Sequence, residues 1–111
     1  MIENTDKRIV LLMIEKIERI IDICQKYSLE EINKNYIYSD SIQFEFEKLY
    51  EDISRLSVIF KINNPTLPFE KLRGIRNRVA HDYESVSINI LFDTATSDLP
   101  LLKEQLATII K

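Results

Sequence analysis

The stretch TDKRIVLLMIEKIERIIDICQKY, residues 5–27, decides the fold class of this chain. Apolar residues recur in it at steps of three and four, with charged residues between them; they are Ile9, Leu12, Met13, Ile17, Ile20 and Cys24. This spacing predicts a long amphipathic helix. Val10, Ile14 and Ile21 make its apolar face wider than one neighbouring helix needs. We therefore expect this helix to lie centrally or to contact a second subunit as well.

Two further helical segments are expected next along the chain. Ser28 and Glu31 have the spacing of a capping box, which predicts a short helical turn over residues 28–35. From Ile42 to Phe60 the apolar residues again step by three and four, as in antiparallel helix pairs of a bundle. This second long helix is expected to run unbroken to Phe60.

The C-terminal half begins with a break and continues as helix. The segment NNPTLP, residues 63–68, interrupts the helical pattern, and its last proline suits the first turn of a third helix. Ser87 is expected to cap a fourth helix that runs through Ala95. Asp98 and Pro100 are expected to begin a short terminal helix.

Composition agrees with an all-α fold. The 111 residues include one glycine and three prolines, which is little material for the turns of a β fold. We expect a single domain, residues 1–111, folded as an up-and-down four-helix bundle with a short C-terminal helix. Cys24 is the only cysteine, no signal peptide is evident, and charged residues interrupt every apolar run. These features favour a soluble, cytoplasmic protein that does not bind membranes.

The stretch KLRGIRNRVAHDY, residues 71–83, holds the only glycine and the only histidine of a chain with net charge −3. On an ideal helix, where each residue advances 100°, Leu72, Ile75 and Val79 fall within about 60° of one another. We expect these three residues to face the core. The rest of the stretch is then free to form a second, polar face.

The polar face carries Gly74 and His81, which fall within about 20° of each other on an ideal helix, with Asn77 beside them. A glycine inside a helix costs about 1 kcal/mol relative to alanine, and close approach of another backbone is the usual reason for one. The simplest candidate is the same helix of a second subunit, because a two-fold axis would place two copies of this face together. We therefore expect a homodimer with a contact at Gly74.

Arg76 and His81 suit metal-free cleavage of RNA. His81 can accept and return a proton near neutral pH, and the Arg76 guanidinium can stabilise the charge that develops on a phosphorane. Asn77 could orient the imidazole or the substrate. Arg76 and His81 are about 140° apart on an ideal helix, so they could converge only if the helix loosens after Ala80 or if two subunits each contribute one residue.

The other cations and acids have less specific roles. Lys71, Arg73 and Arg78 are expected to hold the RNA backbone. Glu51 and Asp52 could face the Arg76 region, but we expect them to face solvent. Neither a zinc site nor a glycine-rich phosphate loop is present in the sequence, so we expect no metal and no cofactor.

RNRVAHDY, together with the flanking LPFEKLRGIRN and DLPLLKEQL, resembles the R-x4-H-x-Y signature and surroundings of HEPN-domain ribonuclease toxins of the HepT type. The resemblance implies a homodimeric all-α bundle in which Arg76 and His81 of both subunits line a shared cleft. It also implies a metal-independent endoribonuclease, the toxin of a type VII toxin–antitoxin pair, with tRNA or mRNA as substrate. The partner would be a minimal nucleotidyltransferase antitoxin that transfers AMP from ATP onto Tyr83.

A rival hypothesis is a non-catalytic, HEPN-like helical module that binds a nucleotidyltransferase or a nucleotide. The mild acidity of the chain favours this rival, because it would repel RNA on average. The complete set of Arg76, Asn77, His81 and Tyr83 favours the enzyme.

Overall fold

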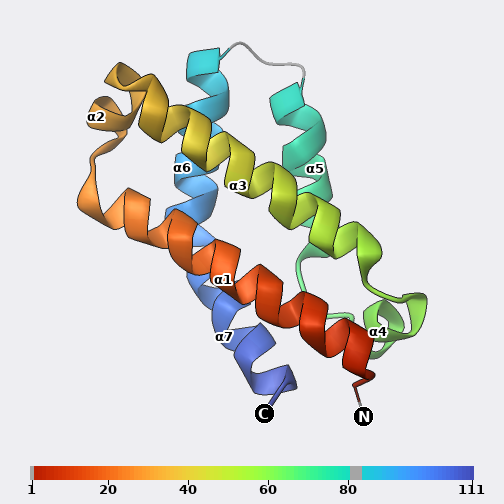
Figure 1. Ribbon diagram of the computed structural model, residues 1–111. Coiled ribbons are helices and arrows are strands. Elements are labelled where there is room, and N and C mark those ends of the chain that lie inside the picture. Colours follow the sequence, from red (N-terminus) through yellow and green to blue (C-terminus); the bar gives the residue numbers. More distant parts are fainter. Residues whose placement is uncertain (1, 81–83) are drawn as a thin grey trace.

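The computed structural model describes residues 2–80 and 84–111, and the side chains of residues 84–86 lie outside that description. Within the described residues the chain forms helices and no strand, so the predicted all-α class is confirmed. The helices are α1 (Asn4–Lys26), α2 (Leu29–Lys34), α3 (Tyr36–Arg55), α4 (Val58–Asn63), α5 (Phe69–Ala80), α6 (Glu84–Ser97) and α7 (Leu99–Ile109) (Figure 1).

The long helices α1 and α3 lie side by side and run in opposite directions (Figure 1). α5, α6 and α7 lie across them as a second layer, and α1 packs against α3, α6 and α7. The apolar stripe of α1 is buried from Ile9 to Cys24 except at Leu12, which is half-buried. The central position expected for this helix from its wide apolar face is therefore confirmed.

The prediction of one continuous helix from Ile42 to Phe60 was wrong. α3 begins earlier, at Tyr36, and ends at Arg55, after which the short helix α4 begins at Val58. The Oγ of Ser57 caps α4 by accepting a hydrogen bond from the amide of Phe60 at 3.1 Å. The apolar spacing concealed this break, because buried residues on both sides of it keep the three- and four-residue steps.

Asp6 on α1 holds the break in place. Its carboxylate accepts hydrogen bonds from the Ser57 amide at 2.9 Å and from the Ser57 hydroxyl at 2.6 Å. Asp6 is buried, so these bonds replace water that its charge would otherwise require. The connection between α3 and α4 is thus bonded to a residue 51 positions away in sequence.

The cap predictions had mixed outcomes. The capping box is confirmed: Ser28 Oγ accepts from the Glu31 amide at 3.1 Å, and the Ser28 amide donates to Glu31 Oε1 at 2.9 Å. Asp98 precedes α7 as expected. The prediction for Ser87 was wrong, because α6 already begins at Glu84. The Ser87 hydroxyl instead donates to the carbonyl of Val79 at 3.3 Å and so joins α6 to α5.

Asp52 differs from its expected position at the surface. It is only 3% exposed, and its Oδ2 lies 2.8 Å from Lys16 Nζ on α1. Arg55 Nη1 lies 3.4 Å from the other carboxylate oxygen. Glu51, its neighbour, is exposed as expected. Burial of Asp52 is possible because two cations neutralise its charge.

None of the helices described combines the length and the apolar character needed to cross a membrane.

Candidate functional site

Helix α5 presents two different faces, as its sequence predicts. Leu72 is fully buried, and Ile75 and Val79 are half-buried against the core. Gly74 and Asn77 on the other side are exposed. The helix begins directly after Pro68, whose carbonyl accepts the Leu72 amide at 3.0 Å. The sequence of α5 therefore fixes both its start and its orientation.

Gly74 has open space around it in the described part of the chain. A Cβ atom added there would meet no described heavy atom within 4 Å outside its own helix and its chain neighbours. Its backbone is helical, without a positive φ angle. Neither packing against the described residues nor backbone geometry therefore requires a glycine. Contact with a second subunit stays a prediction.

His81 and Tyr83 lie outside the described residues. Arg76 is described and exposed, one turn before Ala80 at the end of α5. The convergence of Arg76 and His81 therefore stays a prediction. The structure does describe the residues that surround Arg76.

The expected RNA-binding cations lie on two sides of α5. Lys71 and Arg78 line a groove between α5 and α6, where Lys71 Nζ lies 2.7 Å from Asp98 Oδ1. This hydrogen bond raises the pKa of Lys71 above its usual range. Arg73 instead lines a cavity between α5 and α3, together with Arg76. The structure therefore does not bring Lys71, Arg73 and Arg78 onto one surface.

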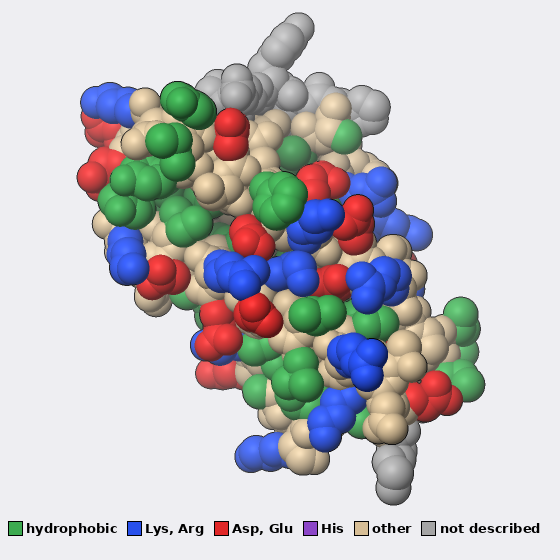
Figure 2. Space-filling model, viewed as in Figure 1, with side chains coloured by type: hydrophobic (Ala, Val, Ile, Leu, Met, Phe, Trp, Pro, Cys, Tyr) green, Lys and Arg blue, Asp and Glu red, His purple; other side chains and the backbone are tan. Residues whose placement is uncertain are grey.

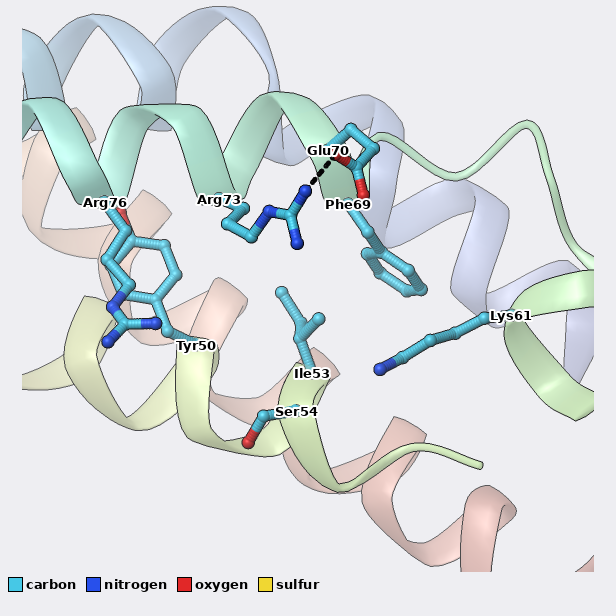
Figure 3. A pocket seen from close by; sticks show the side chains of 8 residues that line it. All are labelled: Tyr50, Ile53, Ser54, Lys61, Phe69, Glu70, Arg73 and Arg76. Atoms are coloured by element: carbon cyan, nitrogen blue, oxygen red, sulfur yellow. Dashed lines mark hydrogen bonds and ion pairs between the residues drawn. The ribbon is translucent and has the colours of Figure 1, made fainter. Parts of the chain in front are cut away.

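The cavity beside Arg76 has a volume of about 270 Å³. It lies between α3 and α5, with α4 at one end (Figure 3). Its lining residues are Tyr50, Ile53, Ser54, Lys61, Phe69, Glu70, Arg73 and Arg76. We call it the Arg76 cavity. In Figure 3, Tyr50 stands beside Arg76 at one end, while Phe69 and Lys61 approach each other at the other end.

Tyr50 forms an uncharged wall of the Arg76 cavity. Only 8% of the residue is exposed, and its hydroxyl finds no hydrogen-bond partner among the described residues. Burial raises its pKa well above the usual range, the charge of Glu47 adds to the rise, and Arg76 opposes it. The phenol therefore stays neutral at physiological pH and presents a ring rather than a charge.

Sequence reasoning did not identify Tyr50, Lys61 or Phe69 as site residues. Tyr50 and Ile53 are three residues apart and lie beside the core stripe of α3. This spacing can be seen in the sequence, but ordinary core residues have the same spacing, so it does not indicate a site. Lys61 reaches the cavity only because the chain breaks between α3 and α4. That break depends on Asp6 and Ser57, which no local pattern connects.

Charge on the surface is mixed. Figure 2 shows basic and acidic side chains interspersed on the face formed by α1 and α3, without a broad patch of one sign. Within the described ranges, no three side chains of His, Cys, Asp or Glu are grouped to share a metal ion.

Comparison with known proteins identifies the family. The model of the family "Ribonuclease HepT-like" matches residues 13–109. A protein of Caldanaerobacter subterraneus named "Putative RNase" is 21% identical over 99 residues, covering 89% of this chain and 88% of that protein. One of the same name from Methanocaldococcus jannaschii is 24% identical, covering 89% and 82%. "Probable ribonuclease HepT" of Thermococcus cleftensis is 24% identical, covering 81% and 86%.

No solved structure matches the chain significantly. The family match nevertheless spans most of the chain, from the middle of α1 to the end of α7, and includes all of α5. The resemblance seen in residues 71–83 is confirmed: this chain belongs to the HepT-like ribonuclease family.

Proposed function

We propose that this chain is a metal-independent endoribonuclease that acts as the toxin of a type VII toxin–antitoxin pair. One observation carries the proposal: the family match over residues 13–109 includes the whole R-x4-H-x-Y pattern formed by Arg76, His81 and Tyr83. The names of the relatives, which describe ribonucleases, support the same activity. The substrate class is RNA, either tRNA or mRNA.

The reaction needs only this chain's side chains and the RNA itself. The ribose 2′-oxygen forms a bond to the adjacent phosphorus, and the bond from that phosphorus to the 5′-oxygen of the next nucleotide breaks. His81 accepts the 2′-hydroxyl proton and returns a proton to the leaving oxygen. Arg76 donates hydrogen bonds to the phosphorane oxygens as their charge grows, and its exposure leaves it accessible to RNA. Asn77 orients the imidazole or the substrate.

A homodimer would complete this site. Arg76 and His81 would point in directions about 140° apart on a straight helix, so residues from two subunits can converge where those of one straight helix cannot. Gly74 and Asn77 form the exposed, outward side of α5, where an opposing copy would approach most closely. The open space at Gly74 supports such an approach, because nothing in the described chain fills it.

Regulation would act on Tyr83. The proposed partner is a minimal nucleotidyltransferase antitoxin that transfers AMP from ATP onto its hydroxyl. Tyr83 follows His81 by two positions, with only Asp82 between them, so a bulky, negatively charged AMP group there would block access to the site and repel RNA phosphates. Intact-mass measurement after incubation with the partner and ATP should show added AMP units, and Tyr83→Phe should abolish them.

A cleavage assay tests the catalytic proposal. Purified wild-type protein should cut tRNA or mRNA in the presence of a chelator, and Arg76→Ala and His81→Ala should each lose cleavage by about a hundredfold or more. Arg8→Ala, which removes an exposed arginine from α1, is the matched control and should cleave normally. If wild-type protein leaves both RNAs intact and is harmless to bacteria without its partner, the chain is a non-catalytic module instead. The ion pairs that engage Lys71 and Arg73 are the observation that favours that second reading.

A further inference from the structure

The Arg76 cavity extends the site beyond the residues that would cleave RNA. We propose that this cavity binds one nucleotide of single-stranded RNA next to the cleaved phosphate, with its base against Phe69 and Ile53 and its phosphate beside Lys61 and Arg73. The proposal rests on the proposed ribonuclease function and adds a binding subsite to it. Three properties of the cavity support it: its apolar walls, its charge and its position.

The walls of the cavity suit a flat, uncharged base. Phe69 is half-buried against the core, so its ring is held in place, and Figure 3 shows it at the edge of the cavity above Ile53. Tyr50 adds a second ring, kept neutral by its burial. Proteins that bind single-stranded RNA commonly place bases on such aromatic rings beside positively charged groups. The cavity has both features within one space.

The charge of the cavity is opposite to that of the whole chain. Among the described residues, Lys61, Arg73 and Arg76 line it together with one acid, Glu70, which leaves two net positive charges in a chain of net charge −3. Arg73 Nη2 lies 2.6 Å from Glu70 Oε2, an exposed contact that engages one end of a guanidinium with five donors. The remaining donors can contact phosphate. Single-stranded RNA is therefore attracted here although the protein as a whole is acidic.

The groove on the other side of α5 provides a comparison within the same molecule. Lys71 and Arg78 line it, but so do Asp93 and Asp98, and its lining residues in the described part of the chain include no aromatic side chain. Its cations and acids balance, and Lys71 is already paired. The same helix thus offers RNA one cationic, aromatic cavity and one neutral groove, and the nucleotide is assigned to the former.

Position and size define what the cavity can hold. Arg76 lies at one end and Lys61 at the other (Figure 3), so a nucleotide in between is adjacent to the phosphate that Arg76 would contact. The volume of about 270 Å³ is near the lower limit of small-ligand pockets. It accommodates a single nucleotide rather than a longer segment.

Binding of a short, fluorescent, single-stranded RNA to the full-length chain tests the charge argument. His81→Ala in every protein prevents cleavage during the measurement. Lys61→Gln and Arg73→Gln should each weaken binding roughly threefold to tenfold and lower the slope of log affinity against log salt by about 0.7. Arg19→Gln is the matched control: like Arg73, Arg19 is exposed and lies 2.6 Å from an acid one turn away on its own helix. It should leave affinity and slope unchanged.

Photocrosslinking tests the place of the base. RNA that carries 4-thiouridine should crosslink to the tryptic peptide of residues 62–71, which contains Phe69, or to the peptide that contains Tyr50. Phe69→Leu, which keeps an apolar side chain but removes the ring, should reduce affinity and crosslinking at least about threefold. Thermal melting verifies that the variant is folded. Crosslinks confined to the tryptic peptide of residues 79–103, which contains Asn89, Ile90 and Asp93 of the groove beside Lys71, would overturn the assignment.

The remaining outcomes separate this inference from the proposed function. If wild-type protein cleaves RNA but Lys61→Gln, Arg73→Gln and Phe69→Leu bind RNA as tightly as the control, the subsite is wrong and the ribonuclease stands. If no RNA is bound or cleaved, both fail. A parallel measurement with AMP distinguishes a free nucleotide from RNA. If AMP binds, RNA does not, and Arg73→Gln abolishes the binding of AMP, the RNA assignment is wrong. Weaker dimerisation of these variants with unchanged RNA affinity would show a protein interface instead.

Discussion

The ion pair between Lys16 on α1 and Asp52 on α3 holds the α3 wall of the Arg76 cavity against the rest of the protein. Asp52 lies between Tyr50 and Ile53 in sequence, and both of these line the cavity. Lys16→Met and Asp52→Leu each replace one charged side chain with an apolar one of related size. Together with the double variant they form a double-mutant cycle.

The structure predicts unequal costs for the two single variants. The charges lie 2.8 Å apart, which at an effective dielectric constant of about 20 corresponds to an attraction of about 6 kcal/mol, much of it offset by desolvation. Lys16→Met leaves the Asp52 carboxylate buried, with only Arg55 at 3.4 Å, and should cost about 3 kcal/mol. Asp52→Leu leaves an ammonium on a flexible stem that can reach water, and should cost about 1–2 kcal/mol.

The double variant should be nearly as stable as wild type, within about 1 kcal/mol, because a buried ion pair and a well-packed apolar pair are often equivalent. Urea unfolding followed by circular dichroism measures the four stabilities. Lys48→Met and Glu51→Leu form the matched control cycle, because this exposed pair on α3 lies 3.3 Å apart and should couple by no more than about 0.5 kcal/mol. A coupling energy at Lys16 and Asp52 no larger than the control value would refute the reasoning.

Three further predictions use urea unfolding, light scattering and thiol labelling. Asp6→Ala should cost about 2 kcal/mol in urea unfolding, because the amide and hydroxyl of Ser57 lose their acceptor; a cost near zero would mean that the α3–α4 break is held by other contacts. Gly74→Ala should stabilise the monomer by up to about 1 kcal/mol, since the described chain leaves room for the added methyl, whereas Gly74→Leu should weaken the dimer in light scattering with helical content kept. An unchanged dimer would contradict the expected contact. Burial raises the pKa of Cys24 to about 11, so the thiolate is scarce in the folded protein below that pH. Labelling by a thiol reagent at about pH 8 should be slow and become fast in urea, and stability should fall as the pH rises through the ordinary thiol pKa towards 11.

The orientation of α5 was predictable because a helix repeats every 3.6 residues and its apolar residues face the core. Leu72, Ile75 and Val79 needed no information from elsewhere in the chain. Lys71 and Arg73 are two residues apart, which is about 200° around the helix. Their placement on opposite sides of α5 was therefore predictable from the sequence. What the sequence did not reveal was which neighbouring helix each side would meet.

The break between α3 and α4 and the burial of Asp52 were not predictable by the same means. Each depends on a polar contact between helices: Ser57 with Asp6, and Asp52 with Lys16. A local pattern of charged residues predicts a solvent-exposed face. It contains no information about an oppositely charged partner on another helix. The only sign of the contact between Asp52 and Lys16 in the sequence was that the two longest apolar stripes carry opposite charges beside them.

The angular order around α5 connects the proposed dimer with the proposed RNA subsite. Arg76 and Arg73 follow the core face on the α3 side, Asn77 and Gly74 come next on the outward side, and Arg78 and Lys71 return towards α6. A second subunit on the outward side would therefore lie between the cavity and the groove. RNA that reaches Arg76 would then meet Arg73 and the cavity first, while the groove would lie across the dimer contact. The dimer would thus select the cationic side of α5 for RNA and leave the neutral side for other contacts.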